Sequence, residues 1–330
     1  MNWKLTKLSL LFVGILIMGF SFNTLGQEYT MEDATRSIKK GDQKKRADDY
    51  PAAINAFSEC VEICNHLGTS ADELRVDAEK KLVKSHLDYA NELLKESKYD
   101  ESLKHYEKAV ELAEKYKQED YKAKAERNIP KVYYQKGKDF LSDNIFKEAI
   151  TNFEEAIKRD PDYPWAYVRK AQTYMKMNDG EKLVRAVDSA IIAGERTETE
   201  KAVKAAKDIG YKHYAGKGIK ALKAKDYQTS AENLKLAVKY NGSPKIKHYL
   251  AMSYGQLSKY DEAIKYEEKA IEEMQGEESE EEMAKYYYNL GTYYEKNNDK
   301  AKACEAYKNA AYGDYKENAE YKIKHALKCN

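Results

Sequence analysis

The stretch Tyr133-Tyr134-Gln135-Lys136-Gly137-Lys138-Asp139-Phe140 is followed at regular intervals by Ala149, Phe153, Ala156 and Pro161. Aromatic residues surround a small residue in the first part, and small and large residues alternate at helical spacing in the second. Two antiparallel helices joined by a short turn approach closely only where side chains are small, and bulky residues then fill the space on either side. The stretch therefore predicts a pair of packed helices.

The same pattern recurs along the chain, and in each copy a small residue in the first helix precedes an anchor in the second helix by 12 residues. The copies carry Gly41 with Ala53, Ala90 with Ser102, Gly137 with Ala149, Ala171 with Leu183, Gly218 with Ser230, Ala251 with Ala263, and Gly291 with Ala303. One pair cannot bury its apolar face alone, so stacked neighbours must form the core. Glu267 departs from the pattern, because an aromatic or large apolar residue is usual there, and it predicts that the sixth repeat is the weakest.

A small residue among aromatics on one helix, then Ala, an aromatic, Ala and Pro on the next, resembles the tetratricopeptide repeat, and the seven copies cover nearly the whole chain after residue 26. The resemblance implies an all-α fold, a right-handed superhelical solenoid of about seven antiparallel helix pairs. Residues 27–330 are expected to form this solenoid. A C-terminal capping helix from about residue 315 is expected to cover the last exposed face.

Several repeats are longer than the usual 34 residues, and the surplus has helical character. Ser70-Ala71-Asp72-Glu73, Thr197-Glu198-Thr199-Glu200 and Ser279-Glu280-Glu281-Glu282 match the capping box, in which a hydroxyl and a carboxylate bond the first free amides of a helix. We therefore predict that some first helices begin early and run long. Pro130 lies within one such extension, so we expect a kink or a break just before it.

Charged residues make up 34% of the chain, with 57 basic and 56 acidic residues, so the net charge is close to zero. This balance gives no support to nucleic-acid binding, which usually requires a strongly basic domain. The P-loop, the nucleophile elbow and the zinc-protease helix motif are all missing from the sequence, and its six histidines fall at unrelated repeat positions. We expect a protein that is not an enzyme and needs no cofactor.

The N-terminus has the order of an export signal, because Lys4 and Lys7 precede an apolar run from Leu8 to Phe20 and Thr24-Leu25-Gly26 then offers a cleavage site. Residues 1–26 are interpreted as a cleaved signal peptide. The alternative is a membrane anchor, but a run of about 13 residues is shorter than the roughly 20 that a spanning helix needs. We expect an exported protein of the periplasm, the outer membrane or the cell surface, with no membrane span after cleavage.

The chain has four cysteines, and these can form disulfides if the protein is exported from the reducing cytosol. Cys304 and Cys329 flank a turn near Gly313, so antiparallel helices can bring them close enough for a disulfide. Cys60 and Cys64 are one helical turn apart, and buried free thiols are favoured over a strained local bridge. No suitable set of ligands is spaced for a metal ion, so we expect no metal site.

A row of lysines has the same register in successive first helices. Six residues before the small anchors stand Thr35, Lys84, Lys131, Trp165, Lys212, Lys245 and Lys285, whereas composition predicts about one basic residue among seven positions. This position falls in the first turn of the first helix, where the helix dipole disfavours cations, so local stability does not explain the lysines. We predict that the five lysines line a concave groove and make it basic; solvated lysines without a role are the alternative.

Aromatic residues extend this predicted groove. On the tetratricopeptide pattern Tyr134, Trp165 and Tyr288 face the groove of first helices, where an aromatic ring offers a large contact area at little cost in conformational entropy. The other recurring tyrosines fall at core-facing positions of the repeat, so packing explains them better than contact with a ligand does.

Tetratricopeptide domains that clamp a carboxylate use lysine, asparagine and arginine on this face. Lys131 and Arg169 match two such positions, and Asn91 matches the asparagine position one repeat earlier. Leu87, Gln135 and Trp165 occupy the other clamp positions, so the resemblance does not support recognition of chaperone tails.

The favoured function is a protein–protein interaction scaffold in the cell envelope, which holds an acidic or extended protein or peptide partner in its concave groove. One alternative is a structural subunit of an outer-membrane assembly, secretion or motility complex that docks by its convex face. A second alternative is a module that binds a glycan or a small ligand, for which a pocket of clustered aromatics is the discriminating feature.

Overall fold

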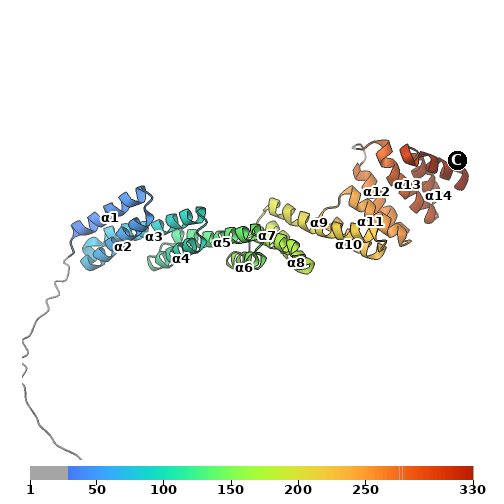
Figure 1. Cartoon of the computed structure of the whole chain (residues 1–330). Coiled ribbons are helices and arrows are strands. Elements are labelled where there is room, and N and C mark those ends of the chain that lie inside the picture. The colour runs from blue at the N-terminus through green and yellow to red at the C-terminus, as the bar shows by residue number, and fades with distance from the viewer. Residues whose placement is uncertain (1–28, 275, 277, 330) are drawn as a thin grey trace, which may run out of the picture. The chain divides into compact units, whose positions relative to one another are not determined.

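The computed structural model describes residues 29–274, 276 and 278–329, and these residues form helices and no strand (Figure 1). The first helices of the pairs are α1 (Met31–Arg46), α3 (Asp72–Lys95), α5 (Glu119–Ser142), α7 (Pro164–Lys176), α9 (Glu200–Lys223), α11 (Pro244–Gln256) and α13 (Glu280–Lys296). The second helices are α2 (Tyr50–Leu67), α4 (Tyr99–Lys115), α6 (Phe146–Arg159), α8 (Gly180–Arg196), α10 (Tyr227–Tyr240), α12 (Tyr260–Met274) and α14 (Lys300–Asn309). The predicted all-helical solenoid of helix pairs is confirmed. The predicted signal peptide, residues 1–26, lies outside the described residues.

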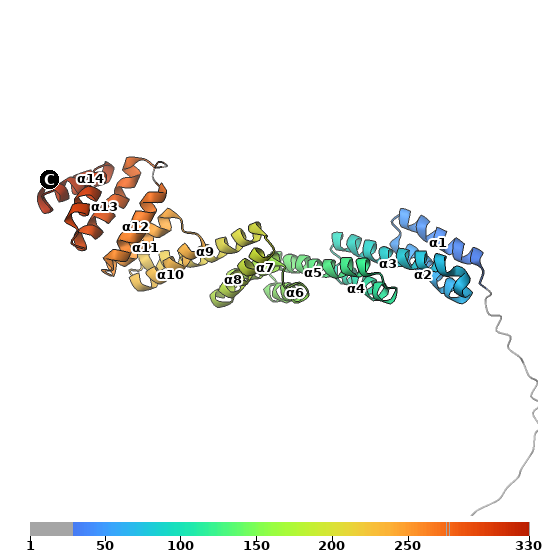
Figure 2. The same ribbon diagram turned by 180° about the vertical axis from the view of Figure 1, so that it is seen from behind.

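The helices form two compact units. The smaller unit ends at Ser85 and contains α1, α2, a 3-10 turn η1 (Gly68–Ala71) and the first part of α3. The larger unit begins at His86 and contains the rest of α3 and all later helices. Figure 2 shows the same helices from behind, with α13 beside α14 at the C-terminal end in both views.

The pairs whose small anchor is glycine make the close contact that the sequence pattern predicts. In α5, a Cβ atom added to Gly137 would lie 2.7 Å from the ring of Phe153 in α6. In α13, a Cβ atom on Gly291 would lie 2.9 Å from the ring of Tyr307 in α14. Phe153 and Tyr307 are fully buried. The small anchors therefore allow the large side chains of the second helix to fill the space between the two helices.

The turns within the pairs follow one sequence rule. Each turn contains a residue with positive φ, and in four of the seven pairs an aspartate follows it and caps the second helix, as in Asn178-Asp179 and Asn298-Asp299. Asn tolerates the left-handed conformation better than most side chains, and the aspartate carboxylate accepts a hydrogen bond from a free backbone amide of the first turn. These short polar turns fix the antiparallel arrangement.

The predicted early starts of the long first helices are confirmed, because α3, α5 and α9 each have 24 residues. Of the three predicted capping boxes, only the one between Ser279 and Glu282 forms. The hydroxyl of Ser70 donates instead to the Leu67 carbonyl within η1, and that of Thr197 donates to the Ala193 carbonyl at the end of α8. Those two predictions were wrong, because each hydroxyl donates a hydrogen bond to a carbonyl of the preceding helix and does not cap the following one.

The break expected before Pro130 does not occur, because α5 is continuous from Glu119 to Ser142 with Pro130 inside it. Pro130 lies seven residues before its small anchor, at the register where Pro164 and Pro244 begin α7 and α11. Proline has no backbone N–H, so the hydrogen bond that another residue at position 130 would donate to the carbonyl of Glu126 is absent. Glu126 is exposed, so water can satisfy this carbonyl, and the buried neighbours Ala125 and Ile129 hold the extension against the core.

The C-terminal segment is a short cap rather than one long helix. A 3-10 turn η2 (Gly313–Tyr315), α15 (Lys316–Tyr321) and a π-helical turn η3 (Lys322–Ala326) follow α14. Ala319 is fully buried, and Ile323 and Leu327 pack against the last core cluster. The predicted disulfide between Cys304 and Cys329 is present, with a Cα–Cα distance of 5.8 Å.

Cys60 and Cys64 are free and buried, as predicted. Burial, followed by the nearby Cys64, raises the pKa of the Cys60 thiol to about 12. Because the thiolate is the reactive form, Cys60 is an inert part of the core of the smaller unit.

Candidate partner-binding surface

The lysine row is exposed on the first helices. In the larger unit Lys131, Lys212, Lys245 and Lys285 are all exposed, and in the smaller unit Lys84 is exposed on α3. An α-helix turns about 100° per residue, so six residues place each lysine about 120° away from the face that packs on the second helix. Each lysine therefore occupies the same position relative to its own helix pair.

These lysines keep their charge available. Lys131 Nζ donates to Asn128 at 2.9 Å, while the ammonium groups of Lys245 and Lys285 lie 6.0 and 4.9 Å from the ring centroids of Tyr249 and Tyr286. Neither these three lysines nor Lys212 forms an ion pair with any carboxylate in the described part of the chain. Unpaired cations at one register produce a positive potential on that face.

The helix dipole opposes a positive charge at only part of this row. Lys245 lies in the first turn of α11, as predicted, but Lys131 and Lys212 lie in the middle of α5 and α9 because those helices begin early. The dipole acts within the first turn, so it neither favours nor disfavours these two lysines. Their shared register is the stronger observation.

Two of the predicted groove aromatics are packed inside the protein. Tyr134 is buried, and its ring lies 5.0 Å from the Tyr163 ring and 6.1 Å from the Phe153 ring. Tyr288 is half-buried, and its ring contacts those of Tyr307 and Tyr315. A position three residues before the small anchor turns only about 60° from the packed face, which explains this burial. Both rings are therefore excluded from the candidate partner-binding surface.

The other predicted residues have internal hydrogen-bond partners. Asn91 donates to the Leu87 carbonyl at 2.8 Å and accepts from the Tyr106 hydroxyl at 2.6 Å. Arg169 donates to the Tyr134 hydroxyl at 3.3 Å and to Gln172 at 2.8 Å. Trp165 is half-buried against the Tyr134 cluster. Arg169 keeps part of its surface accessible, whereas the Asn91 amide is already bonded at both of its polar atoms.

A hollow of about 300 Å³ between α7 and α8 is the place where clustered aromatics could hold a glycan. Tyr167 and Tyr174 line it together with Lys170, Lys182 and Arg185. Each of these cations already pairs with a carboxylate of the chain, Lys170 with Glu154 at 2.7 Å, Lys182 with Asp179 at 2.9 Å and Arg185 with Glu181 at 3.0 Å. The site therefore offers little unpaired charge to a ligand.

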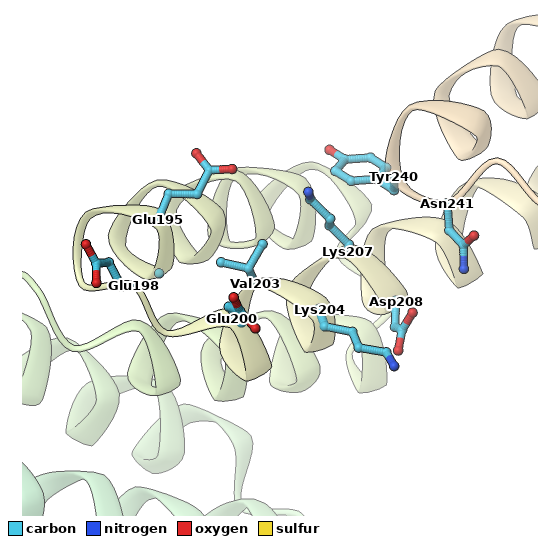
Figure 3. Close-up of a pocket in the computed structure, with 10 residues that line it drawn as sticks. Glu195, Glu198, Glu200, Val203, Lys204, Lys207, Asp208, Tyr240 and Asn241 are labelled. Carbon is cyan, nitrogen blue, oxygen red and sulfur yellow. The ribbon is translucent and has the colours of Figure 1, made fainter.

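A larger pocket of about 580 Å³ lies among the end of α8, the first half of α9 and the end of α10 (Figure 3). Val203 and Tyr240 form its apolar part, and Glu195, Glu198, Glu200, Lys204, Lys207 and Asp208 surround it. This pocket could not be predicted from the sequence, because its walls come from three helices of two repeats. The only signal was Val203, which is the one apolar residue larger than alanine between Glu200 and Asp208.

The described residues contain no group of three or more histidine, cysteine, aspartate or glutamate side chains placed to hold a metal ion. Over the same residues, no helix has the length and apolar character needed to cross a membrane.

Models of repeat families match several parts of the chain. The model described as "TPR repeat" matches residues 131–178. The model described as "Tetratricopeptide repeat" matches residues 83–116, 245–273 and 284–312.

Among curated proteins, the chain is 26% identical over 167 residues to Hsp70-Hsp90 organizing protein 2 of Arabidopsis thaliana, covering 43% of this chain and 28% of that one. It is 27% identical over 143 residues to Hsp70-Hsp90 organizing protein 1 of the same plant, covering 38% and 24%. The chain thus spans about a quarter of the length of the curated relatives it matches.

Among solved structures, the complex of the TPR2AB domain of yeast Sti1 with pHSP90 is similar at a TM-score of 0.34 and 15% identity, covering 89% of this chain and 96% of that one. A crystal structure of MamA protein is similar at a TM-score of 0.32 and 18% identity, covering 60% and 96%.

Proposed function

We propose that this chain, which carries tetratricopeptide repeats, is a non-enzymatic protein–protein interaction scaffold of the cell envelope that holds an acidic or extended partner segment along its first helices. The observation that supports the proposal is the row of exposed, unpaired lysines at one register, Lys131, Lys212, Lys245 and Lys285. The face that carries these lysines is the concave groove in our proposal.

In this proposal the lysine row mainly increases the rate at which the partner associates. A single exposed ion pair contributes only about 0–1 kcal/mol, so one lysine cannot hold a partner. Several like charges on one face raise the local potential and accelerate capture of an acidic segment, an effect that weakens as salt rises. The partner would then be retained by many small contacts along successive helices.

The names of the curated relatives support a protein partner, because both are called Hsp70-Hsp90 organizing proteins. This chain has Leu87, Gln135 and Trp165 at positions of the carboxylate clamp, so its partner is proposed to be an acidic segment other than a chaperone tail.

Two features support the envelope. The basic, apolar and small-residue order of residues 1–26 has the form of an export signal, and the Cys304–Cys329 disulfide suits an oxidising compartment. Mass spectrometry of the protein from its own cells should find a mature chain that begins near Gln27. A chain that retains Met1 to Gly26 would overturn the export proposal.

The lysine row is tested by charge reversal in the full mature chain. The variant Lys131→Glu, Lys212→Glu, Lys285→Glu should weaken binding of a poly-glutamate peptide at least tenfold at low salt and flatten its salt dependence, as measured by fluorescence anisotropy. Crosslinking in envelope extract should show the same loss of the main partner.

The matched control replaces three exposed lysines of second helices, Lys147→Glu, Lys235→Glu and Lys269→Glu, which changes the net charge equally. If both triple variants lose binding alike, the effect is one of overall charge and the first-helix surface is wrong.

One observation favours the alternative of a complex subunit, in a form that docks by the turns at the edge of the repeats rather than by the convex face. Ile145, Met175 and Met177 expose 41%, 38% and 44% of their surface at the turns that end α5 and α7. The two turns are joined by a hydrogen bond from Lys176 to Asn144 at 3.1 Å. If the variant Ile145→Ser, Met175→Gln, Met177→Gln loses the crosslinked partner while the lysine variant keeps it, edge docking replaces the groove proposal.

A further inference from the structure

The pocket among α8, α9 and α10 is built by two close helix approaches. A Cβ atom on Gly194 in α8 would lie 2.6 Å from the Val203 side chain, so only glycine lets α8 come this close to α9. A Cβ atom on Gly210 in α9 would lie 3.0 Å from the ring of Tyr240. The Tyr240 hydroxyl donates to Asp188 at 2.9 Å, which fixes the ring across the gap between α8 and α10. The pocket is therefore held by well-packed walls.

The charges around the pocket are not paired with other side chains of the described residues. Among the described residues, none of Glu195, Glu198, Glu200, Lys204, Lys207 and Asp208 forms an ion pair or a side-chain hydrogen bond. Elsewhere in this chain many charged side chains are paired, as Arg196 is with Asp162 at 2.6 Å. Six unpaired charges around an apolar centre match the general form of a ligand site, which is mostly apolar with a few convergent polar groups.

The chain contains an internal counterpart that shows this arrangement is specific. The α4–α5–α6 segment has the same helix spacing 81 residues earlier, so Val203 corresponds to Lys122 and Tyr240 to Arg159. Lys122 pairs there with Glu114 at 3.6 Å, and the Arg159 guanidinium lies 5.2 Å from the Tyr133 ring centroid. At these two positions the counterpart therefore has cations with partners, where the pocket has the apolar Val203 and the ring of Tyr240. The long first helix alone does not produce the apolar pocket.

The acidic residues outnumber the lysines around the pocket, and two of them lie together at one end. Figure 3 shows Glu195 and Glu198 at the α8–α9 turn at one end, with Tyr240 and Asn241 at the other. Val203 lies between them, and Lys204 and Lys207 follow it on α9. An occupant that complements this order carries a positive group beside an apolar one. A basic residue would face the glutamates, while an apolar side chain would contact Val203 and the edge of Tyr240.

We infer that this pocket is a docking site for a partner polypeptide segment in which a lysine or arginine lies next to a branched aliphatic or aromatic residue. A volume of about 580 Å³ is within the range of ligand pockets. The site is separate from the lysine row and has the opposite preference, since its acidic end selects a basic segment. It extends the proposed function by adding a second recognition surface.

The test uses the full mature chain and three fluorescent peptides in a Gly/Ser background, carrying Arg-Arg-Leu-Phe, Glu-Glu-Leu-Phe or Arg-Arg-Gly-Ser. The first peptide should bind at least tenfold more tightly than either of the others. Glu195→Lys with Glu198→Lys should weaken it at least tenfold, and Val203→Thr, which keeps the shape but adds a hydroxyl, should weaken it several-fold. Amide chemical shifts should change around Gly194, Val203 and Tyr240.

The matched control is Glu119→Lys with Glu126→Lys on α5, which alters two exposed acids of the counterpart segment and should leave binding unchanged. The lysine-row variant should also bind this peptide normally, so the two proposals can fail separately. Equal binding of Arg-Arg-Gly-Ser would overturn the inference by showing only unspecific charge attraction. Shifts confined to other helices, or self-association of the chain through this pocket, would overturn it as well.

Discussion

Glu267 illustrates how a departure from the repeat pattern is accommodated at the level of single residues. It is fully buried in α12, where the other second helices place Phe57, Tyr106, Phe153, Val187, Leu234 and Tyr307. His248 of α11 lies opposite, with its Nδ1 atom 2.7 Å from Glu267 Oε1, while Oε2 has no hydrogen-bond partner. Burial raises the pKa of Glu267, and the contact with His248 opposes this rise. The departure is therefore a buried polar pair that spans two helices.

Replacing both members of this pair should stabilise the sixth repeat or leave it unchanged. Removing one partner strands a buried polar group, so His248→Leu or Glu267→Leu alone should each lower the free energy of unfolding by about 1–3 kcal/mol. The double variant replaces a half-satisfied pair with apolar contacts and should recover that loss or more. Urea unfolding of the four proteins, read as a double-mutant cycle, measures the coupling. Additive losses in the double variant would contradict this account.

The histidine pair of α3 and α4 predicts a pH effect. His86 Nδ1 and His105 Nδ1 are 2.9 Å apart, so one must donate and the other accept, and both cannot be charged. Burial, followed by the charge of His105, lowers the pKa of His86 to about 4, and burial also lowers the pKa of His105. In the unfolded chain both histidines take up a proton near their ordinary pKa of about 6.5. The contribution of the neutral pair to the free energy of unfolding is thus fully present above about pH 6.5 and is lost as pH falls toward 4.

The variant His86→Tyr with His105→Asn should remove this acid sensitivity, because Tyr133 and Asn152 occupy the same positions in the next repeat. For His86 the full effect is on the order of 3 kcal/mol from its shift to about 4. Lys108, Glu111 and Glu101 are the charged neighbours of the pair and are kept in both proteins. Unfolding measured from pH 7.5 to pH 4.5 should give a smaller loss of stability in the variant. Equal losses would exclude the histidine pair as the cause.

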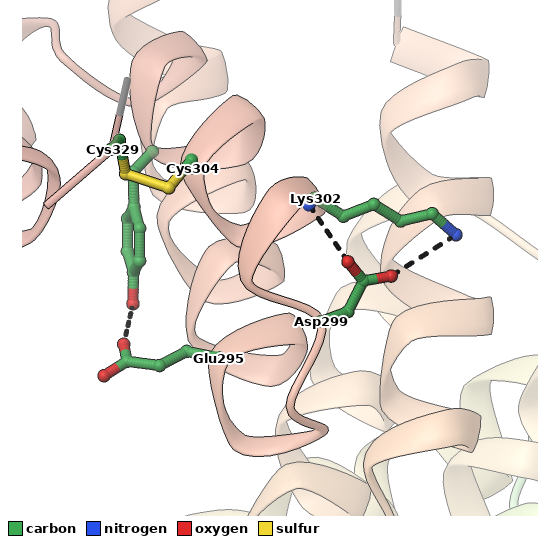
Figure 4. The surroundings of a disulfide bond; sticks show 6 residues. Glu295, Asp299, Lys302, Cys304 and Cys329 are labelled. Carbon is green, nitrogen blue, oxygen red and sulfur yellow. Dashed lines mark hydrogen bonds and ion pairs between the residues drawn. A yellow bond between two sulfur atoms is a disulfide. The ribbon is translucent and has the colours of Figure 1, made fainter. Parts of the chain in front are cut away.

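At the level of elements, the C-terminal cap depends on one covalent bond, the disulfide shown in Figure 4, and on one ionic contact. The disulfide joins Cys329 to Cys304 of α14, and Lys322 bonds the Glu295 carboxylate at 2.8 Å. That carboxylate also accepts from the buried Tyr307 hydroxyl at 2.7 Å. Since α15 has only 6 residues, it cannot be stable as an isolated helix. Its order must come from these attachments and from the buried Ala319.

Cys304→Ser with Cys329→Ser should therefore release the cap and leave α13 and α14 paired. A bond that closes a loop of 25 residues contributes about 3 kcal/mol in the chain-entropy model. Hydrogen exchange followed by mass spectrometry should show faster exchange from Lys316 to Leu327 in the variant. Reduction of the wild-type protein should reproduce this change. Unaltered exchange in the cap would mean that packing alone holds it.

At the level of the whole molecule, features encoded by local register could be predicted from sequence, and features that depend on several helices could not. The contact of Gly137 with Phe153 follows from one spacing, and so do the exposed positions of Lys212 and Lys285. The burial of Tyr134 depends on Tyr163 from the next turn, and the α8–α10 pocket depends on Gly194 and Gly210 together. The partner of Glu267 is likewise found only when α11 and α12 are placed side by side.

The last prediction concerns how far a local change spreads through the larger unit. In a repeat protein each helix pair contacts only its neighbours, so stability behaves as a sum of local and nearest-neighbour contributions. Two glycines of α9, Gly216 and Gly218, test this because they differ only in their surroundings. A Cβ atom on Gly218 would lie 2.6 Å from the Leu234 side chain and 3.1 Å from its backbone nitrogen, whereas Gly216 has no atom within 4 Å of that position.

Gly218→Ala should therefore destabilise α9 and α10 by about 1–3 kcal/mol through overpacking, while Gly216→Ala should stabilise the same helix by about 0.5–1 kcal/mol through reduced backbone entropy of the unfolded chain. Hydrogen exchange in the Gly218→Ala protein should rise most in α9 and α10, less in α8 and α11, and not measurably in α5, α6, α13 or α14. A uniform rise in all these helices would show that the larger unit unfolds as one cooperative body. A partner held along several first helices could then not be released by loosening one repeat, and the scaffold would have to release it as a whole.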